Sequence, residues 1–163
     1  MEIIISDFPM PPSHNLLYDY VKPYTLKNGI TQKKWKYSTV YKDYISVCYE
    51  WSFKHYARLK KIKKDIGAST GILKLDTFFI FPYTKIFSKS GAIKKIDASN
   101  RLKACHDCFS EIVGLDDKHF FCGYFGKYPT SDDDERVIMV VSEMETAELK
   151  RFLNPNSYLS LNN

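Results

Sequence analysis

The residues best suited to chemistry stand together near the middle of the chain. They form the run Ile96-Asp97-Ala98-Ser99-Asn100-Arg101-Leu102-Lys103, and Asp116-Asp117 begins thirteen residues after its last lysine. Carboxylate oxygens are the ligands that divalent cations such as Mg²⁺ prefer, and a lysine can stabilise the charge on a phosphate. Asp97 precedes an expected helix, whose first backbone N–H groups also favour an anion. These residue types predict metal-assisted cleavage of a phosphodiester.

The same residues also have an ordinary structural interpretation. Asp97 or Ser99 can cap the helix, and Lys103 can form a surface ion pair with Asp107, four residues further along. The Asp116-Asp117 pair can simply be a turn. Both interpretations stand on these residues alone.

Three motifs, taken in order along the chain, resemble the RusA-type Holliday junction resolvases. That family looks like a strand ending in Pro-Pro-Ser-x-Asn, then a helix opened by Asp-x-Asp-Asn-x-x-Lys, then an Asp-Asp pair. Here the matching segments are Pro11-Pro12-Ser13-His14-Asn15, Asp97 to Lys103, and Leu115-Asp116-Asp117. Their order and spacing agree over about residues 3–144. The resemblance implies an endonuclease that resolves four-way DNA junctions by paired nicks.

The resemblance also implies a role for each matching residue. Asp97 and Asp117 would be catalytic carboxylates that bind Mg²⁺, for which Mn²⁺ may substitute. Lys103 would be the catalytic cation at the scissile phosphate. Asp116 and Ser99 are further candidate metal ligands.

Ser99 departs from the family motif, because it stands where the second aspartate is expected. A neutral hydroxyl is a weaker ligand than a carboxylate. Asn100 matches the motif asparagine, and Asp107 falls where the family often has an acidic residue. A DNA-binding protein that has lost cleavage is therefore the alternative function, and a protein-binding inhibitor on the same fold is a more distant one.

Positive charge is concentrated in one half of the chain. Residues 22–103 carry 19 Lys and Arg against 5 Asp and Glu, whereas residues 104–163 carry 5 against 11. Clustered cations are typical of a polyanion binder, although a solvated basic helix face gives the same count. The expected DNA contacts are Asn15, Lys60, Lys61, Lys63, Lys64, Lys85, Lys89, Lys94, Lys95 and Arg101.

The expected partners are branched DNA and a second copy of the chain. The resemblance implies a homodimer, whose two-fold axis would match the near-symmetry of a four-way junction. No apolar run approaches the roughly 20 residues of a membrane span, so no membrane is expected. Four cysteines without a signal peptide predict a cytoplasmic protein.

Hydrophobic periodicity predicts one α/β or α+β domain over residues 1–163. The expected order is β-α-β-α-β-β-α, with a mixed sheet packed against two main helices. A RusA-like core covers about residues 3–144, and a C-terminal helix and tail cover 145–163. Strands are expected at 2–8, 72–82, 120–128 and 136–144, and helices at 34–64, 99–113 and 146–153. The last two strands are expected to form a hairpin.

Two smaller expectations concern aromatic and cysteine residues. Residues 14–33 are expected to be a loop with a turn at Asn28-Gly29. Its tyrosines, Tyr18 to Tyr24, could stack on exposed bases, but packing back onto the sheet is the interpretation that we favour. Cys105 belongs to the apolar stripe of the 99–113 helix, which favours a core position over a zinc site.

Overall fold

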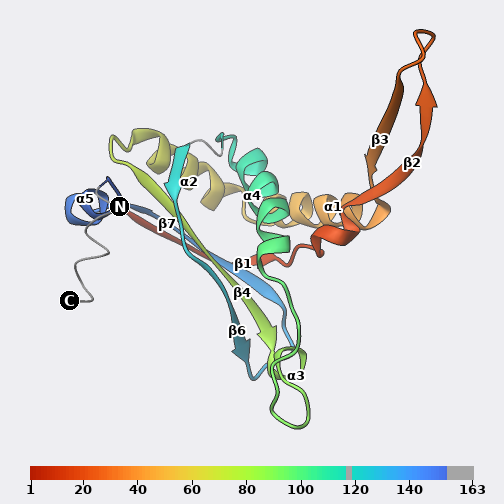
Figure 1. Cartoon of the computed structure of the whole chain (residues 1–163). Coiled ribbons are helices and arrows are strands. Elements are labelled where there is room, and N and C mark those ends of the chain that lie inside the picture. The colour runs from red at the N-terminus through yellow and green to blue at the C-terminus, as the bar shows by residue number, and fades with distance from the viewer. Residues whose placement is uncertain (117–118, 154–163) are drawn as a thin grey trace, which may run out of the picture.

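The computed structural model describes residues 1–116 and 119–153 and is built around a mixed five-stranded sheet (Figure 1). Its strands are β1 (Glu2–Pro9), β4 (Leu73–Pro82), β5 (Phe120–Cys122), β6 (Phe125–Thr130) and β7 (Arg136–Glu143). The central strand β4 pairs with β7 antiparallel on one side and with β5 and β6 parallel on the other. β1 pairs antiparallel with the outer side of β7. The expected mixed sheet in a single α+β domain is confirmed.

The described residues form six helices: η1 (His14–Leu16), α1 (Thr39–Lys54), α2 (Tyr56–Ala68), α3 (Tyr83–Ile86), α4 (Ser99–Val113) and α5 (Thr146–Leu153). Of these, α1, α2 and α4 cover one face of the sheet, whereas α3 lies at the end of β4 and α5 lies beside Lys74 of β4 (Figure 1). α1, α2 and α4 supply most of the helical core residues. None of the helices in the described part of the chain is long and apolar enough to cross a membrane.

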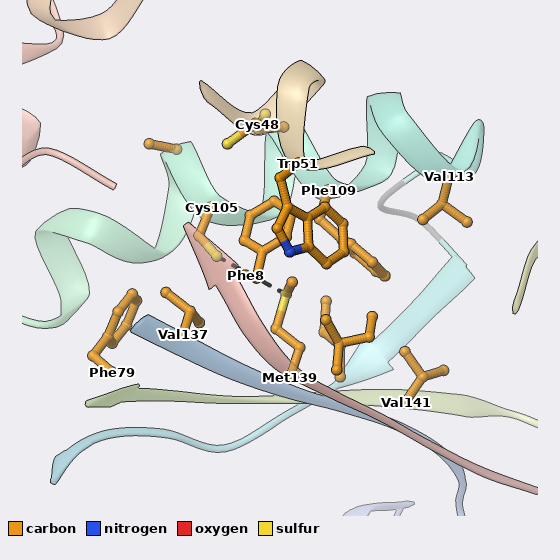
Figure 2. Packing of buried hydrophobic residues seen from close by; sticks show 14 of the residues in the cluster. Phe8, Cys48, Trp51, Phe79, Cys105, Phe109, Val113, Val137, Met139 and Val141 are labelled. Atoms are coloured by element: carbon orange, nitrogen blue, oxygen red, sulfur yellow. Dashed lines mark hydrogen bonds between the residues drawn. The ribbon is translucent and has the colours of Figure 1, made fainter. Parts of the chain in front are cut away.

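The core lies between these helices and the sheet (Figure 2). Successive strand residues point to opposite faces, so alternate residues of β4 such as Leu73 and Leu75 are buried. The Phe8 ring of β1 packs edge-on against Trp51 of α1 and Phe109 of α4, with centroids 5.1 and 6.0 Å away. Cys105 is buried beside Met139, as its place in the apolar stripe predicts. This packing fixes α4 above the centre of the sheet.

The expected loop at residues 14–33 is wrong, because a hairpin projects there from the body of the molecule (Figure 1). Its strands are β2 (Tyr18–Thr25) and β3 (Thr31–Tyr37), which form a separate two-stranded sheet. The turn at Asn28-Gly29 is confirmed: Gly29 has φ +80°, and the Leu26 N–H donates to the Ile30 carbonyl across it. The hairpin sequence lacks the alternation of apolar and polar residues that is typical of a half-buried strand, because the hairpin covers none of the main sheet.

Two other expectations need correction. The strands near residues 120–128 and 136–144 do not form a hairpin, because β4 lies between β6 and β7. The near-continuous apolar run at the end of β4 is typical of a strand that is buried on both faces. The expected helix 34–64 begins only after Ser38, whose hydroxyl caps α1 by accepting from the Tyr41 N–H, and it breaks at His55 into α1 and α2. The 99–113 helix is confirmed, and Gly114 ends it at φ +70°.

Candidate functional site

Asp97 caps the N-terminal end of α4. Its Oδ1 atom accepts the Ser99 hydroxyl at 2.5 Å and the Asn100 N–H at 3.3 Å. The Ser99 hydroxyl, the backbone N–H groups of Asn100 and Ser99, and the charge of Lys127 together hold the pKa of Asp97 below its ordinary value. Asp97 therefore presents an exposed, ionised carboxylate at neutral pH. Ser99 is the first helical residue and a donor to the cap, not the cap itself.

The motif lysine lies one turn further along α4 and already has an anionic partner. Lys103 Nζ is 3.0 Å from Asp107 Oδ2, and both side chains are exposed. Asp107 also faces α1, where its charge, after burial, helps to raise the pKa of Tyr41 above its ordinary value. The half-buried Asn100 lies on the first turn of α4. These positions fit the surface-pair interpretation and leave the ammonium of Lys103 at the surface.

Two of the three motif segments meet at this end of α4. The Arg101 guanidinium donates from Nη1 to the Pro11 carbonyl and lies over the Phe81 ring, 5.5 Å from its centroid. η1, which contains the exposed Asn15, packs against α4 as well. Burial lowers the pKa of Arg101. Arg101, expected to contact DNA, therefore holds the Pro11 segment on α4.

The third motif segment lies at the opposite end of α4. Asp116 follows Gly114, and a helix of 15 residues is about 22 Å long at 1.5 Å per residue. Within one chain, Asp116 is therefore too far from Asp97 to share a cation with it. Asp117 lies outside the described residues.

The described residues do not by themselves form a metal site. They contain no group of three or more His, Cys, Asp or Glu side chains that could hold a metal ion. The N-terminal end of α4 contributes one motif carboxylate, Asp97, and a neutral hydroxyl, Ser99. These residues alone do not fit a Mg²⁺ site.

The expected DNA-binding lysines fall into two exposed groups. Lys60, Lys61, Lys63 and Lys64 lie on α2, and Lys85, Lys89, Lys94 and Lys95 lie on and after α3. Three of them also have local roles. The ammonium of Lys63 lies 2.7 Å from the position of a Cβ on Gly114, at the negative end of the α4 dipole. Lys85 pairs with Glu135 at 2.6 Å, and Lys94 donates to the Thr84 carbonyl at 2.7 Å.

Sequence reasoning missed two basic features. Lys127 of β6 donates to the Ile96 carbonyl at 3.1 Å and lies close enough to Asp97 to lower its pKa. No local signal could place it there, because its position depends on the parallel pairing of β6 with β4. The β2–β3 hairpin was also missed as a basic element, and its lysine content was the available signal.

Comparisons with known proteins assign no role to these residues. No protein-family model matches the chain, and no curated protein matches it.

Proposed function

We propose that the protein binds branched DNA and is a Mg²⁺-dependent endonuclease of the RusA type that resolves four-way junctions as a homodimer. One observation carries the proposal. The segment around Pro11 and the segment from Asp97 to Lys103 are far apart in sequence, yet they meet at the N-terminal end of α4. Their convergence supports a common functional surface.

The charges around this end of α4 support DNA as the ligand. Lys127 lies beside Asp97, and the exposed Lys89 and Lys95 precede it in the chain. Lysines that neutralise phosphates release counterions, so the affinity should fall steeply with salt. Such contacts are made to the backbone and are independent of base sequence.

The catalytic part of the proposal needs carboxylates beyond those described at this end. An acidic residue of a second copy, such as its Asp117, would have to complete the site with Asp97. Together these carboxylates would hold Mg²⁺, whose contribution there would be Lewis-acid chemistry at the phosphate. The exposed Lys103 ammonium, paired with Asp107 at 3.0 Å, would stabilise charge on the phosphate.

A DNA-binding protein without nuclease activity is the second candidate. It is favoured by the separation of Asp97 and Asp116 along α4 and by the neutral Ser99 at the motif position of an aspartate. This protein would use the same lysines and would bind junctions without cutting them.

The test uses the purified full-length chain with a synthetic four-way junction and a linear duplex of the same sequence, in Mg²⁺ and in Mn²⁺. We expect paired symmetric nicks in the junction. Asp97→Asn and Asp117→Asn should abolish the nicks and retain junction binding. Asp133→Asn removes an exposed carboxylate from the 131–135 turn and is the matched control that should cut normally.

The possible outcomes separate the candidates. Junction binding without cleavage in either metal would reject the nuclease and support the second candidate. A chain that binds no branched, double-stranded or single-stranded nucleic acid would reject both, and would favour a protein-binding inhibitor.

A further inference from the structure

The β2–β3 hairpin, residues 18–37, is an arm that stands apart from the folded core (Figure 1). It contains five lysines and one acidic residue, so its net charge is +4 over 20 residues. Among its described side chains, Lys27, Lys36 and Tyr20 are exposed. A two-stranded hairpin is marginally stable alone in water, so the arm depends on its attachment to the body.

The root of the arm is firmly attached to α1. The Ser38 N–H donates to the Leu17 carbonyl at 3.0 Å, where the arm meets the body. The Tyr18 and Tyr37 rings stack across the two strands at 5.5 Å, and Tyr37 contacts Tyr41 of α1 at 4.8 Å. This row of rings fixes the direction in which the arm leaves the molecule.

The same row of rings connects the arm to the part of α4 that carries Lys103 and Asp107. Tyr41 lies close enough to Asp107 for that carboxylate to raise its pKa, and Asp107 pairs with Lys103. The arm therefore starts beside the surface that carries Asn100 and Lys103. A ligand that binds at Asn100 and Lys103 therefore lies within reach of the arm as well.

The dimensions of the arm suit duplex DNA. Strand β2 has 8 residues and so reaches about 26 Å at 3.3 Å per residue. A two-stranded ribbon fits the major groove, which is about 12 Å wide. On such a ribbon the exposed Lys27 and Lys36 would be available to phosphates along the groove.

The positive charge of the arm argues against a second copy of this chain as the molecule that the arm binds. Its most acidic segment is the 131–135 turn, but Asp132 and Asp134 already pair with Arg136, and Glu135 pairs with Lys85. Two arms of charge +4 would repel each other. Phosphate is the complementary partner.

We propose that the arm inserts into a groove of duplex DNA and grips one duplex of the substrate through its lysines. The inference rests on the proposed DNA binding and names a contact surface outside the lysines expected from the sequence. It assigns the arm to the DNA backbone, and the surface of α4 that carries Asn100 and Lys103 to the neighbouring phosphates.

The test shortens the arm at a point that the strand register defines. Val21 pairs with Lys34, so replacing residues 22–33 by Asn-Gly closes the hairpin with a two-residue turn. The replacement removes three lysines and no acidic residue. Binding to a fluorescent linear duplex and to a four-way junction is measured over a range of salt concentrations. Unfolding midpoints should match the parent chain, because the arm lies outside the core.

We expect the slope of log affinity against log salt to fall by up to about 2.7, since each phosphate contact contributes about 0.9. Lys27→Ala and Lys36→Ala should each lower the slope by up to about 0.9 in the full-length chain. Lys150→Ala on α5, far from the arm, is the matched control and should leave the slope unchanged (Figure 1).

An unchanged affinity and slope in the shortened chain would overturn the inference and leave the proposed DNA binding intact. A shortened chain that binds DNA normally but changes its oligomeric state would assign the arm to a second copy instead. A parent chain that binds neither the duplex nor the junction would overturn both the proposed DNA binding and the role of the arm.

Discussion

Replacing Arg101 by methionine separates its structural role from the DNA contact that its charge suggests. The guanidinium donates to the Pro11 carbonyl and lies over the Phe81 ring. A methionine keeps a long apolar stem at this half-buried position but removes the charge and the donor. If both partners are internal, the substitution should reduce stability and leave DNA binding unchanged.

The expected loss can be worked out from these contacts. A hydrogen bond from a charged donor contributes about 1.5–3 kcal/mol, and a cation over an aromatic ring about 0.5–1 kcal/mol. The loss is partly offset, because Arg101→Met also removes the cost of burying the guanidinium, the cost that lowers the Arg101 pKa. We expect a net loss of about 2 kcal/mol, which in a chain of this size lowers the unfolding midpoint by about 4–8 °C.

Two measurements on the same samples check this expectation. Thermal or urea unfolding gives the stability, and salt titration of duplex binding gives the electrostatic slope. The matched control is Lys95→Met, at an exposed lysine in the loop before α4. It should change stability by less than about 0.5 kcal/mol and lower the slope by up to about 0.9. An Arg101→Met protein with parental stability and a slope reduced by about 0.9 would refute the structural assignment.

Two further predictions concern carboxylates. Ser99→Asp places a second carboxylate beside Asp97, because the Ser99 hydroxyl lies 2.5 Å from Asp97 Oδ1. Mg²⁺ should then raise the unfolding midpoint of the variant more than that of the parent chain, because the cation relieves the repulsion between the two carboxylates. An equal effect of Mg²⁺ on both proteins would contradict a metal site there. Glu143 has a pKa below its ordinary value of 4.5, because it accepts from the Ser69 hydroxyl and pairs with the Met1 ammonium. This stabilisation is present above pH 4.5 and is lost as the pH falls through the lowered pKa. Glu143→Gln should therefore unfold at a lower temperature than the parent at pH 7, with the difference disappearing on acidification, and a constant difference would count against the linkage.

Helix α4 was predictable because its signals are local. Asp97 before the first turn, the apolar stripe that includes Cys105 and Phe109, and Gly114 after the last turn all lie within one segment. The structure places each of them as the sequence indicates. The motif residues on this helix were therefore also placed correctly relative to one another.

The pairing of distant segments could not be predicted in the same way. Strand periodicity predicts strands at residues 120–128 and 136–144, but the partner of β6 and β7 is β4, more than 40 residues earlier in the chain. The contact between Lys127 and Ile96 follows from that pairing, so it was missed as well. The separation of Asp97 and Asp116 depends only on the length of α4, and it could have been estimated from the expected helix.

The arm escaped detection for a different reason. Strand signals depend on a side that faces a core, and β2 and β3 pack on none. Lysines and tyrosines without that alternation resemble a polar loop. The turn at Asn28-Gly29 was the one reliable local signal, and it was correct.

The order β1-β7-β4 in the sheet has a consequence for folding during synthesis on the ribosome. The first strand of the chain takes its place only when the last strand arrives, because Glu2 pairs with Ser142 and Pro9 with Arg136. A ribosome adds about 5–20 residues per second, so β1 waits about 6–25 seconds for its partner after it has been synthesised. During that interval Phe8 has no completed core to enter. The nascent chain therefore presents an unpaired apolar strand to the chaperones at the tunnel exit until β7 has emerged.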